Sequence, residues 1–277
     1  MAATSVERIL ILAKTYPSPS AKYVETSCVA GITDQGQPRR LYPVPFRMLK
    51  EDDQFKKWQW ITVRVRKSND DHRPESHRVF VDTVDSTEPS LSTANHWEAR
   101  REWIERFPLF NSVAEAESAR TRSGLSLALV RPKRIVRLEV TPARDPDWTE
   151  EERAKLIREQ MQGQLFDAPE AERQVRELRK IPFNFHYVYV CDSPDGEIEE
   201  RHKIVDWEAG ALYWHCHARH GNGWEIPFRA KIEENLPAAD LMFLVGTIHR
   251  FPDQWLIVSL IYPPKQRPVE NPQTALF

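Results

Sequence analysis

The stretch Ile9-Leu10-Ile11-Leu12-Ala13 indicates that the first part of the chain is built from β-strands. This short apolar run contains β-branched residues and ends shortly before Pro17 and Pro19, which is typical of a buried strand. Four more strand-like segments follow, separated by turn-forming or acidic stretches. They cover residues 26–33, 39–44, 60–67 and 77–84. Five short strands in so short a segment predict a small β-barrel.

The rest of the chain mixes helices and strands without an internal repeat. Strand character is expected at 126–140, broken at Pro132, and at 183–191 and 202–205. Strands at 241–248 and 255–262 are close enough to pair as a hairpin. Amphipathic or charged patterns predict helices at 96–106, 148–162, 169–180, 206–219 and 224–235.

The predicted fold class is therefore α+β, with a small amino-terminal β-barrel, OB-like (oligonucleotide-binding) or PUA-like, followed by a mixed α/β carboxyl-terminal domain. We expect the barrel domain at residues 1–90 and a helical connecting region with a short β-pair at 91–180. An α+β domain at 181–264 and a flexible tail at 265–277 complete the expected organisation.

Charge, cysteine content and hydropathy limit the kinds of protein that this chain can be. The net charge of −2 conceals an excess of five cations in residues 1–80, which hold 14 Lys and Arg against 9 Asp and Glu. Three cysteines are too few for a disulfide framework, and no apolar run approaches the roughly 18 residues of a membrane span. We expect a cytoplasmic protein that does not enter the membrane.

Cations and aromatic residues are interleaved in the predicted barrel, which is the combination that binds phosphates and stacks on bases. The expected partner is DNA or RNA. The competing interpretation is that the two tryptophans pack on the core and the cations form a solvated face. The candidate nucleic-acid-binding residues are Arg39, Arg40, Tyr42, Lys56, Lys57, Trp58, Trp60, Arg64 and Arg66.

Two stretches in this region, residues 28–32 and 39–43, read Cys-Val-Ala-Gly-Ile and Arg-Arg-Leu-Tyr-Pro. They resemble barrel domains of uncharacterised bacterial proteins, some of them encoded near defence or DNA-modification genes. The resemblance covers about 60 residues. It implies a setting in genome defence or DNA modification.

A second pattern, Q-x-x-L-F, occurs twice, at Gln162, Leu165 and Phe166 and at Gln273, Leu276 and Phe277. It resembles the peptide by which bacterial replication and repair proteins hold the sliding clamp, with a polar Gln and two apolar groups that enter a groove. The resemblance implies the bacterial sliding clamp as a partner. Chance occurrence, or packing of the internal copy on the core, is the alternative.

Residues 186–220 hold an unusual density of His, Cys and acidic side chains. His202, Asp206 and Glu208 are the catalytic candidates, because metal-assisted hydrolysis requires carboxylate ligands and a base that activates water. Helix capping by Asp206 is the structural alternative. A divalent metal is the possible cofactor, and its candidate ligands are Cys191, His202, Cys216 and His220.

Two functions follow from these patterns. The first is a nucleic-acid-associated accessory protein in DNA replication, repair or genome defence, tethered through its clamp-binding-like tail. The alternative is a metal-dependent hydrolase or nucleic-acid-modifying enzyme that uses His202, Asp206 and Glu208. An interaction module with neither activity is the third possibility.

Overall fold

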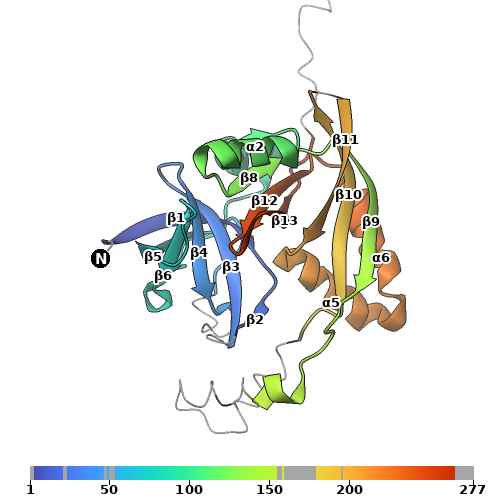
Figure 1. Cartoon of the computed structure of the whole chain (residues 1–277), viewed down its shortest axis with the longest axis horizontal. Coiled ribbons are helices and arrows are strands. Elements are labelled where there is room, and N and C mark those ends of the chain that lie inside the picture. The colour runs from blue at the N-terminus through green and yellow to red at the C-terminus, as the bar shows by residue number, and fades with distance from the viewer. Residues whose placement is uncertain are drawn as a thin grey trace, which may run out of the picture.

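Two β-sheets lie side by side in the computed structural model, which describes residues 3–20, 24–46, 49, 54–154, 158, 179–194 and 196–265. The first sheet closes into a barrel, and the second is an open seven-stranded sheet with helices on one face (Figure 1). The predicted α+β class, with a barrel followed by a mixed α/β region, is confirmed.

The barrel has the strand order of an OB fold. Its strands run in the order β1-β5-β6-β4-β3, and pairing of β3 with β1 closes it. The β4–β6 contact is parallel, while the other neighbouring barrel strands are antiparallel. This is a five-stranded Greek-key barrel, so the OB-like prediction is confirmed. The strands are β1 (Thr4–Lys14), β2 (Ser18–Ser20, paired with β3), β3 (Val24–Thr33), β4 (Pro38–Val44), β5 (Trp60–Lys67) and β6 (Ser76–Val79).

Strand β1 is buried on both faces, which explains its unbroken apolar run. Because side chains alternate along a strand, Ile9 and Ile11 point into the barrel, where they join its interior core. Leu10 and Leu12 point outward and belong to a second core, which the barrel shares with the other sheet. A run without polar residues is therefore required at this strand.

The second sheet has the order β7-β8-β12-β13-β11-β10-β9. The predicted hairpin is confirmed as the antiparallel pair β12 and β13. Within the connecting region, β7 pairs with β8, while β8 also pairs with β12 and β9 pairs with β10. Residues 109–142 thus join the same sheet as residues 183–261. The strands are β7 (Leu109–Phe110), β8 (Leu127–Val130), β9 (Arg134–Pro142), β10 (Phe183–Ser193), β11 (Gly196–Ile204), β12 (Met242–Ile248) and β13 (Phe251–Ile261).

The helices partly follow the expected pattern. Asn95, His96 and Trp97 have positive φ, so the first predicted helix starts with a left-handed turn. A short helix that the sequence did not predict begins at the Ser112 cap, whose side chain accepts from Glu115 N. The helical elements whose two ends both lie within the described residues are η3 (Val81–Thr83), α1 (Ala94–Ile104), α2 (Val113–Ser123), α5 (Trp207–His220), η4 (Gly221–Gly223), α6 (Glu225–Arg229) and η5 (Ala230–Asn235).

Two expectations fall largely outside the described residues. Of the helix expected at 148–162, the structure describes the start, which forms a capping box. Thr149 N–H donates to Glu152 Oε2 at 2.9 Å, and Glu152 N–H donates to Thr149 Oγ1 at 3.1 Å. Most of the helix at 169–180, both Q-x-x-L-F copies and all but the first residue of the tail lie outside the described residues.

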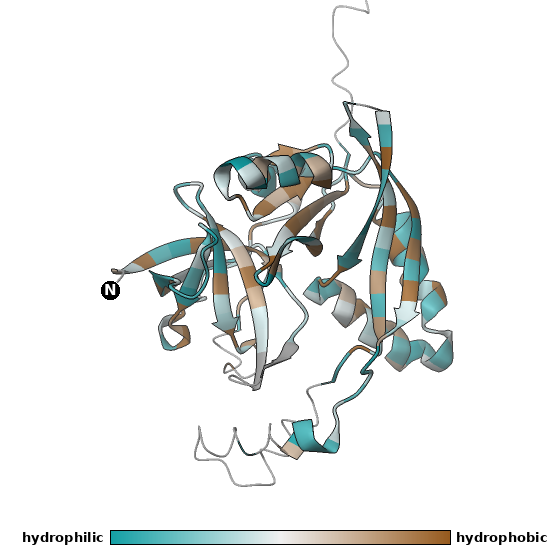
Figure 2. Cartoon of the chain, in the orientation of Figure 1, coloured by the Kyte–Doolittle hydropathy of each residue, from teal (hydrophilic) through white to brown (hydrophobic). Residues whose placement is uncertain are grey.

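The second sheet is packed on both faces. Phe243 and Val245 face α5 and α6, while Met242 and Leu244 face the barrel. In Figure 2, β12 and β13 carry brown hydrophobic segments where they lie between the barrel and the outer strands of the sheet. None of the described helices is both long and apolar enough to cross a membrane.

Candidate functional site

A cleft of about 770 Å³ lies between the barrel and the second sheet. Its barrel wall consists of β3, β4 and β6 together with the loops around residues 15–17 and 68–73. β3 and β4 are the second and third barrel strands, and together with the two loops they correspond to the surface with which OB folds bind oligonucleotides. The opposite wall comes from β10, β11, β12 and the start of α5.

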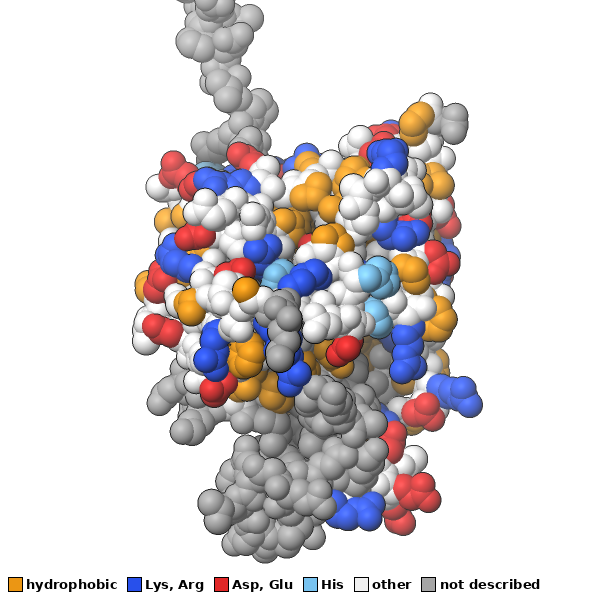
Figure 3. Space-filling model, turned by 60° about the vertical axis from the view of Figure 1, so that its left-hand side comes forward, with side chains coloured by type: hydrophobic (Ala, Val, Ile, Leu, Met, Phe, Trp, Pro, Cys, Tyr) orange, Lys and Arg blue, Asp and Glu red, His pale blue; other side chains and the backbone are white. Residues whose placement is uncertain are grey.

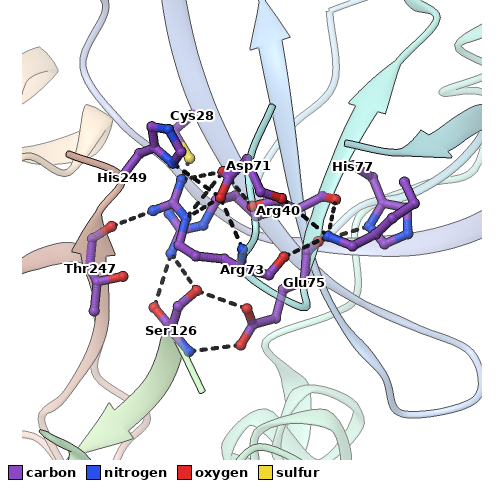
Figure 4. Close-up of polar contacts among 11 residues, drawn as sticks. Cys28, Arg40, Asp71, Arg73, Glu75, His77, Ser126, Thr247 and His249 are labelled. Carbon is purple, nitrogen blue, oxygen red and sulfur yellow. Dashed lines mark hydrogen bonds and ion pairs between the residues drawn. The ribbon is translucent and has the colours of Figure 1, made fainter. Parts of the chain in front are cut away.

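Arg40 of β4 lies at the floor of this cleft and is 3% exposed. Its Nη2 donates to the Ser126 carbonyl oxygen at 3.0 Å, and its Nη1 donates to Cys28 Sγ at 3.4 Å. Ser126 in turn donates from its N–H and Oγ to the buried Glu75 carboxylate at 2.9 and 2.8 Å. Figure 4 shows Ser126 between Arg40 and Glu75, so the Glu75 carboxylate is connected to Arg40 through hydrogen bonds of Ser126.

A second buried arginine, Arg73, links the barrel loop to β12. Its Nη1 donates to the Thr247 carbonyl oxygen at 2.6 Å, while its Nη2 pairs with Asp71 at 2.6 Å (Figure 4). Burial alone would raise the pKa of Asp71, but hydrogen bonds from Arg73 and Ser76 outweigh burial and hold the pKa well below its ordinary value. Arg73 is therefore held by a carboxylate that stays ionised.

Asp71, His72 and His249 form the one group among the described residues whose ligand atoms lie close enough together to hold a metal ion, within 4.8 Å of one another. Arg73 and Ser76 already donate to the Asp71 carboxylate. His249 Nδ1 lies 3.3 Å from Asp71 Oδ1. The Asp71 oxygens are thus already in contact with Arg73, Ser76 and His249, which leaves them less available to a metal ion.

The remaining cleft lining supplies cations and an exposed aromatic ring. Six Lys and Arg side chains line the cleft, against four aspartates. The side-chain amine of Lys203 forms no hydrogen bond or ion pair with any described residue, and burial lowers its pKa. Tyr42 is 47% exposed, with its ring available to a ligand. Arg78 and Arg250 are exposed members of the same lining.

Of the nine expected nucleic-acid-binding residues, Arg40 and Tyr42 line the cleft. Trp58 and Trp60 are 3% and 4% exposed and belong to the core between the sheets, so their rings are covered. Arg39 pairs with Glu7 at 2.6 Å. Lys56 and Arg64 are exposed and Arg66 is half-buried, and the cleft lining includes none of these three.

Lys57 joins the barrel to the second sheet. Its Nζ donates to the Leu260 carbonyl oxygen at 2.7 Å and to Glu208 at 2.9 Å, and it lies 4.0 Å from Asp206. Burial favours the neutral amine, but the two carboxylates outweigh it and raise the pKa of Lys57. The Lys57 ammonium thus stabilises the contact between the two sheets and is not available to a phosphate.

The three catalytic candidates occupy different surroundings. Asp206 is 3% exposed, caps α5 by accepting from Glu208 N at 2.8 Å, and also accepts from Leu260 N at 2.7 Å. His202 Nδ1 bonds the Tyr189 hydroxyl at 2.8 Å, and burial lowers its pKa. Asp206 lines the cleft, whereas His202 and Glu208 are absent from its lining.

The four metal-ligand candidates are not among the described residues brought together for a metal ion. Cys191 and Cys216 are buried in the core under α5 and α6. Burial is the main cause that raises the pKa of Cys191 to about 12, which disfavours the thiolate that a metal requires. His220 is exposed at the end of α5.

Arg73, Lys203, Thr247 and His249 were not among the candidates predicted from the sequence, and they lie on three separate segments of the chain. The signal at residues 70–73 was a charged loop, Asp-Asp-His-Arg, in a turn-rich region. Lys203 and Thr247 are on strands whose order in the sheet decides that they face the barrel. Periodicity within one strand carries no such information.

Residues 110–277 match the family described as "Domain of unknown function (DUF8757)". The chain belongs to this family. Residues 5–106 match a second model, "Domain of unknown function (DUF8758)". The search of curated proteins found no match.

One similar solved structure is entitled "Structure and Conformational Change of a Replication Protein A Heterotrimer Bound to ssDNA". Identity is 8%, and the similarity covers 95% of this chain and 66% of that chain, so this chain spans just under two thirds of its length. The TM-score is 0.24, a level at which the likeness supports no inference about function.

Proposed function

We propose that the protein binds single-stranded nucleic acid, DNA or RNA, in the cleft between the barrel and the second sheet. The observation that carries the proposal is the position of the cleft. The strands β3 and β4 and the two adjoining loops, which form the ligand-binding face of OB folds, are open to a ligand along this cleft.

The lining supplies the two interactions that bind a single strand without sequence preference. Phosphates are attracted by cations, and Lys203, Arg78 and Arg250 have no ion pair among the described residues. Bases stack on aromatic rings, and Tyr42 is exposed in the lining. These three cations and the Tyr42 ring therefore line the same cleft.

A single strand fits this site better than a duplex. Proteins read duplex DNA by inserting a helix or a β-ribbon into the major groove, whereas this site is concave. On the face shown in Figure 3, cationic, acidic and apolar side chains are interspersed, with no broad patch of one sign. Binding is therefore expected to be local to the cleft.

The cellular setting that we propose is DNA replication, repair or genome defence in a bacterium. Its support is the Q-x-x-L-F pattern at Gln273–Phe277, which resembles a sliding-clamp-binding peptide. Removal of these five residues should abolish binding to a purified bacterial clamp without changing the melting temperature. An unchanged affinity in a surface-plasmon-resonance titration rules out the tether and leaves the cleft proposal intact.

Fluorescence anisotropy with labelled oligonucleotides tests strand binding directly. Tyr42→Ala should weaken binding of single strands by about tenfold, in line with roughly 1 to 3 kcal/mol for one stacked base. Lys203→Gln removes a cation that attracts phosphate, so it should weaken binding and also reduce its dependence on salt. Arg134→Gln, an exposed charge on β9 outside the cleft lining, is the matched control. The proposal fails if the cleft variants bind like the control, or if duplex binds as tightly as single strand.

A further inference from the structure

Arg40 is a buried cation without an anionic partner in the part of the chain that the structure describes. The side chains and backbone atoms that accept from its guanidinium are Ser126 and Cys28, which are uncharged. The neighbouring arginines differ in this respect, because Arg39 pairs with Glu7 and Arg73 pairs with Asp71, each at 2.6 Å. Among the described residues, no carboxylate forms an ion pair with Arg40, although the residue is 97% buried.

Two buried polar atoms at the floor of the cleft also have no hydrogen-bond partner among the described residues. They are Arg40 Nε and Thr247 Oγ1, and both residues line the cleft. Thr247 is 4% exposed. Buried donors and acceptors in folded proteins are nearly always paired with protein groups or ordered water, so two such atoms in one cavity are suited to bind a polar ligand.

The surroundings keep this arginine in place. The adjoining residue on β12 is Gly246, where an added Cβ would come within 3.0 Å of Arg40 Nη2. A glycine within a strand is often found where another group approaches the backbone closely. Ser126 fixes the opposite side of the guanidinium through its carbonyl oxygen and hydroxyl. Arg40 is thus held rigidly, with its Nε–H unused.

We propose that Arg40 and Thr247 bind a phosphate group at the floor of the cleft. A phosphate brings the negative charge that Arg40 lacks, and its oxygens accept from both the guanidinium and the Thr247 hydroxyl. The group comes either from a nucleic-acid strand or from a free nucleotide. The strand source rests on the proposed function, whereas the phosphate site itself does not.

The experiment uses the full chain and three probes at constant ionic strength: inorganic phosphate, thymidine 5′-monophosphate and thymidine. Binding is measured by isothermal titration calorimetry and by the shift in melting temperature, because a ligand that binds the folded state raises that temperature. Both phosphate-bearing probes should bind and thymidine should not. If neither phosphate probe binds the wild-type protein, the site is overturned.

Variants locate the site. Arg40→Gln and Thr247→Val should each weaken binding of the phosphate probes by about tenfold or more, since a charged hydrogen bond is lost. Arg134→Gln is the control and should retain wild-type affinity. Thr247→Val preserves the side-chain volume and decides the question alone if Arg40→Gln does not fold. If Arg40→Gln folds, the proposal is overturned when both variants bind the phosphate probes with wild-type affinity. If Arg40→Gln does not fold, wild-type affinity in Thr247→Val overturns it.

The outcomes separate this inference from the proposed function. Phosphate binding that depends on Arg40 and Thr247 without any strand binding supports the site and identifies a free nucleotide or phosphate as its ligand. Strand binding that depends on Tyr42 and Lys203, with phosphate binding unaffected by Arg40→Gln and Thr247→Val, leaves the proposed function standing and removes the phosphate site.

Discussion

Asp71 holds Arg73 in the contact that ties the barrel loop to β12. The hydrogen bonds from Arg73 and Ser76 keep the pKa of Asp71 below its ordinary value of 3.8, despite burial. The ionised carboxylate therefore stabilises the folded state above pH 3.8, and this contribution is lost as the pH falls below that value. Asp71→Asn should lower the free energy of unfolding by about 2 kcal/mol at pH 7. Urea denaturation should show a smaller difference from the wild type at pH 3.

The control for this change lies next to it in the chain. Asp70 is exposed in the same loop and has no ion pair among the described residues, so Asp70→Asn should alter stability by less than about 0.5 kcal/mol. A loss of stability for Asp71→Asn that stays constant from pH 7 to pH 3 would contradict the role given to the carboxylate.

At the level of single residues, the sequence predicted which segments carry charge but not where each charge points. Arg39 and Arg40 are adjacent, so strand alternation places them on opposite faces of β4. The choice of the face that borders the cleft depends on Ser126 and Thr247, which come about 90 and 200 positions later. Trp58 and Trp60 are core residues for a similar reason, because Trp97 and Trp103 of α1, about 40 positions later, pack edge-to-face on their rings.

Strand β12 shapes the phosphate site through its glycine. A Cβ at position 246 would lie 3.0 Å from Arg40 Nη2 and 3.1 Å from Leu127 Cδ2, so Gly246→Ala should push the guanidinium from its position. We expect phosphate binding to weaken by about threefold to tenfold, because a charged hydrogen bond is misaligned but not removed. Calorimetric titration with inorganic phosphate measures the effect. Gly223→Ala, where nothing lies within 4 Å of an added Cβ, should bind as the wild type does.

The elements of the fold were predicted where their signals are local. An apolar run or an alternation is visible within a few residues, so the barrel strands and the β12–β13 hairpin were found. The segment at 126–140 was interpreted as one broken strand, yet its halves pair at different positions in the sheet. Helix α2 escaped detection because few of its residues are apolar and only Val113 and Ala116 are buried.

The whole molecule is expected to unfold as one unit, although two family models match its two parts. Leu10 and Leu12 of the barrel share a buried core with Met242 and Leu244 of the second sheet, and Lys57 bonds across the same boundary. Separation of the parts would expose this apolar surface to water, at a cost of about 25 cal/mol per Å². Urea unfolding followed by tryptophan fluorescence and by far-ultraviolet circular dichroism should therefore give coincident curves. A fragment of residues 1–108 should lose the cooperative transition, whereas two separate midpoints in the full chain would show that the cleft joins independently stable domains.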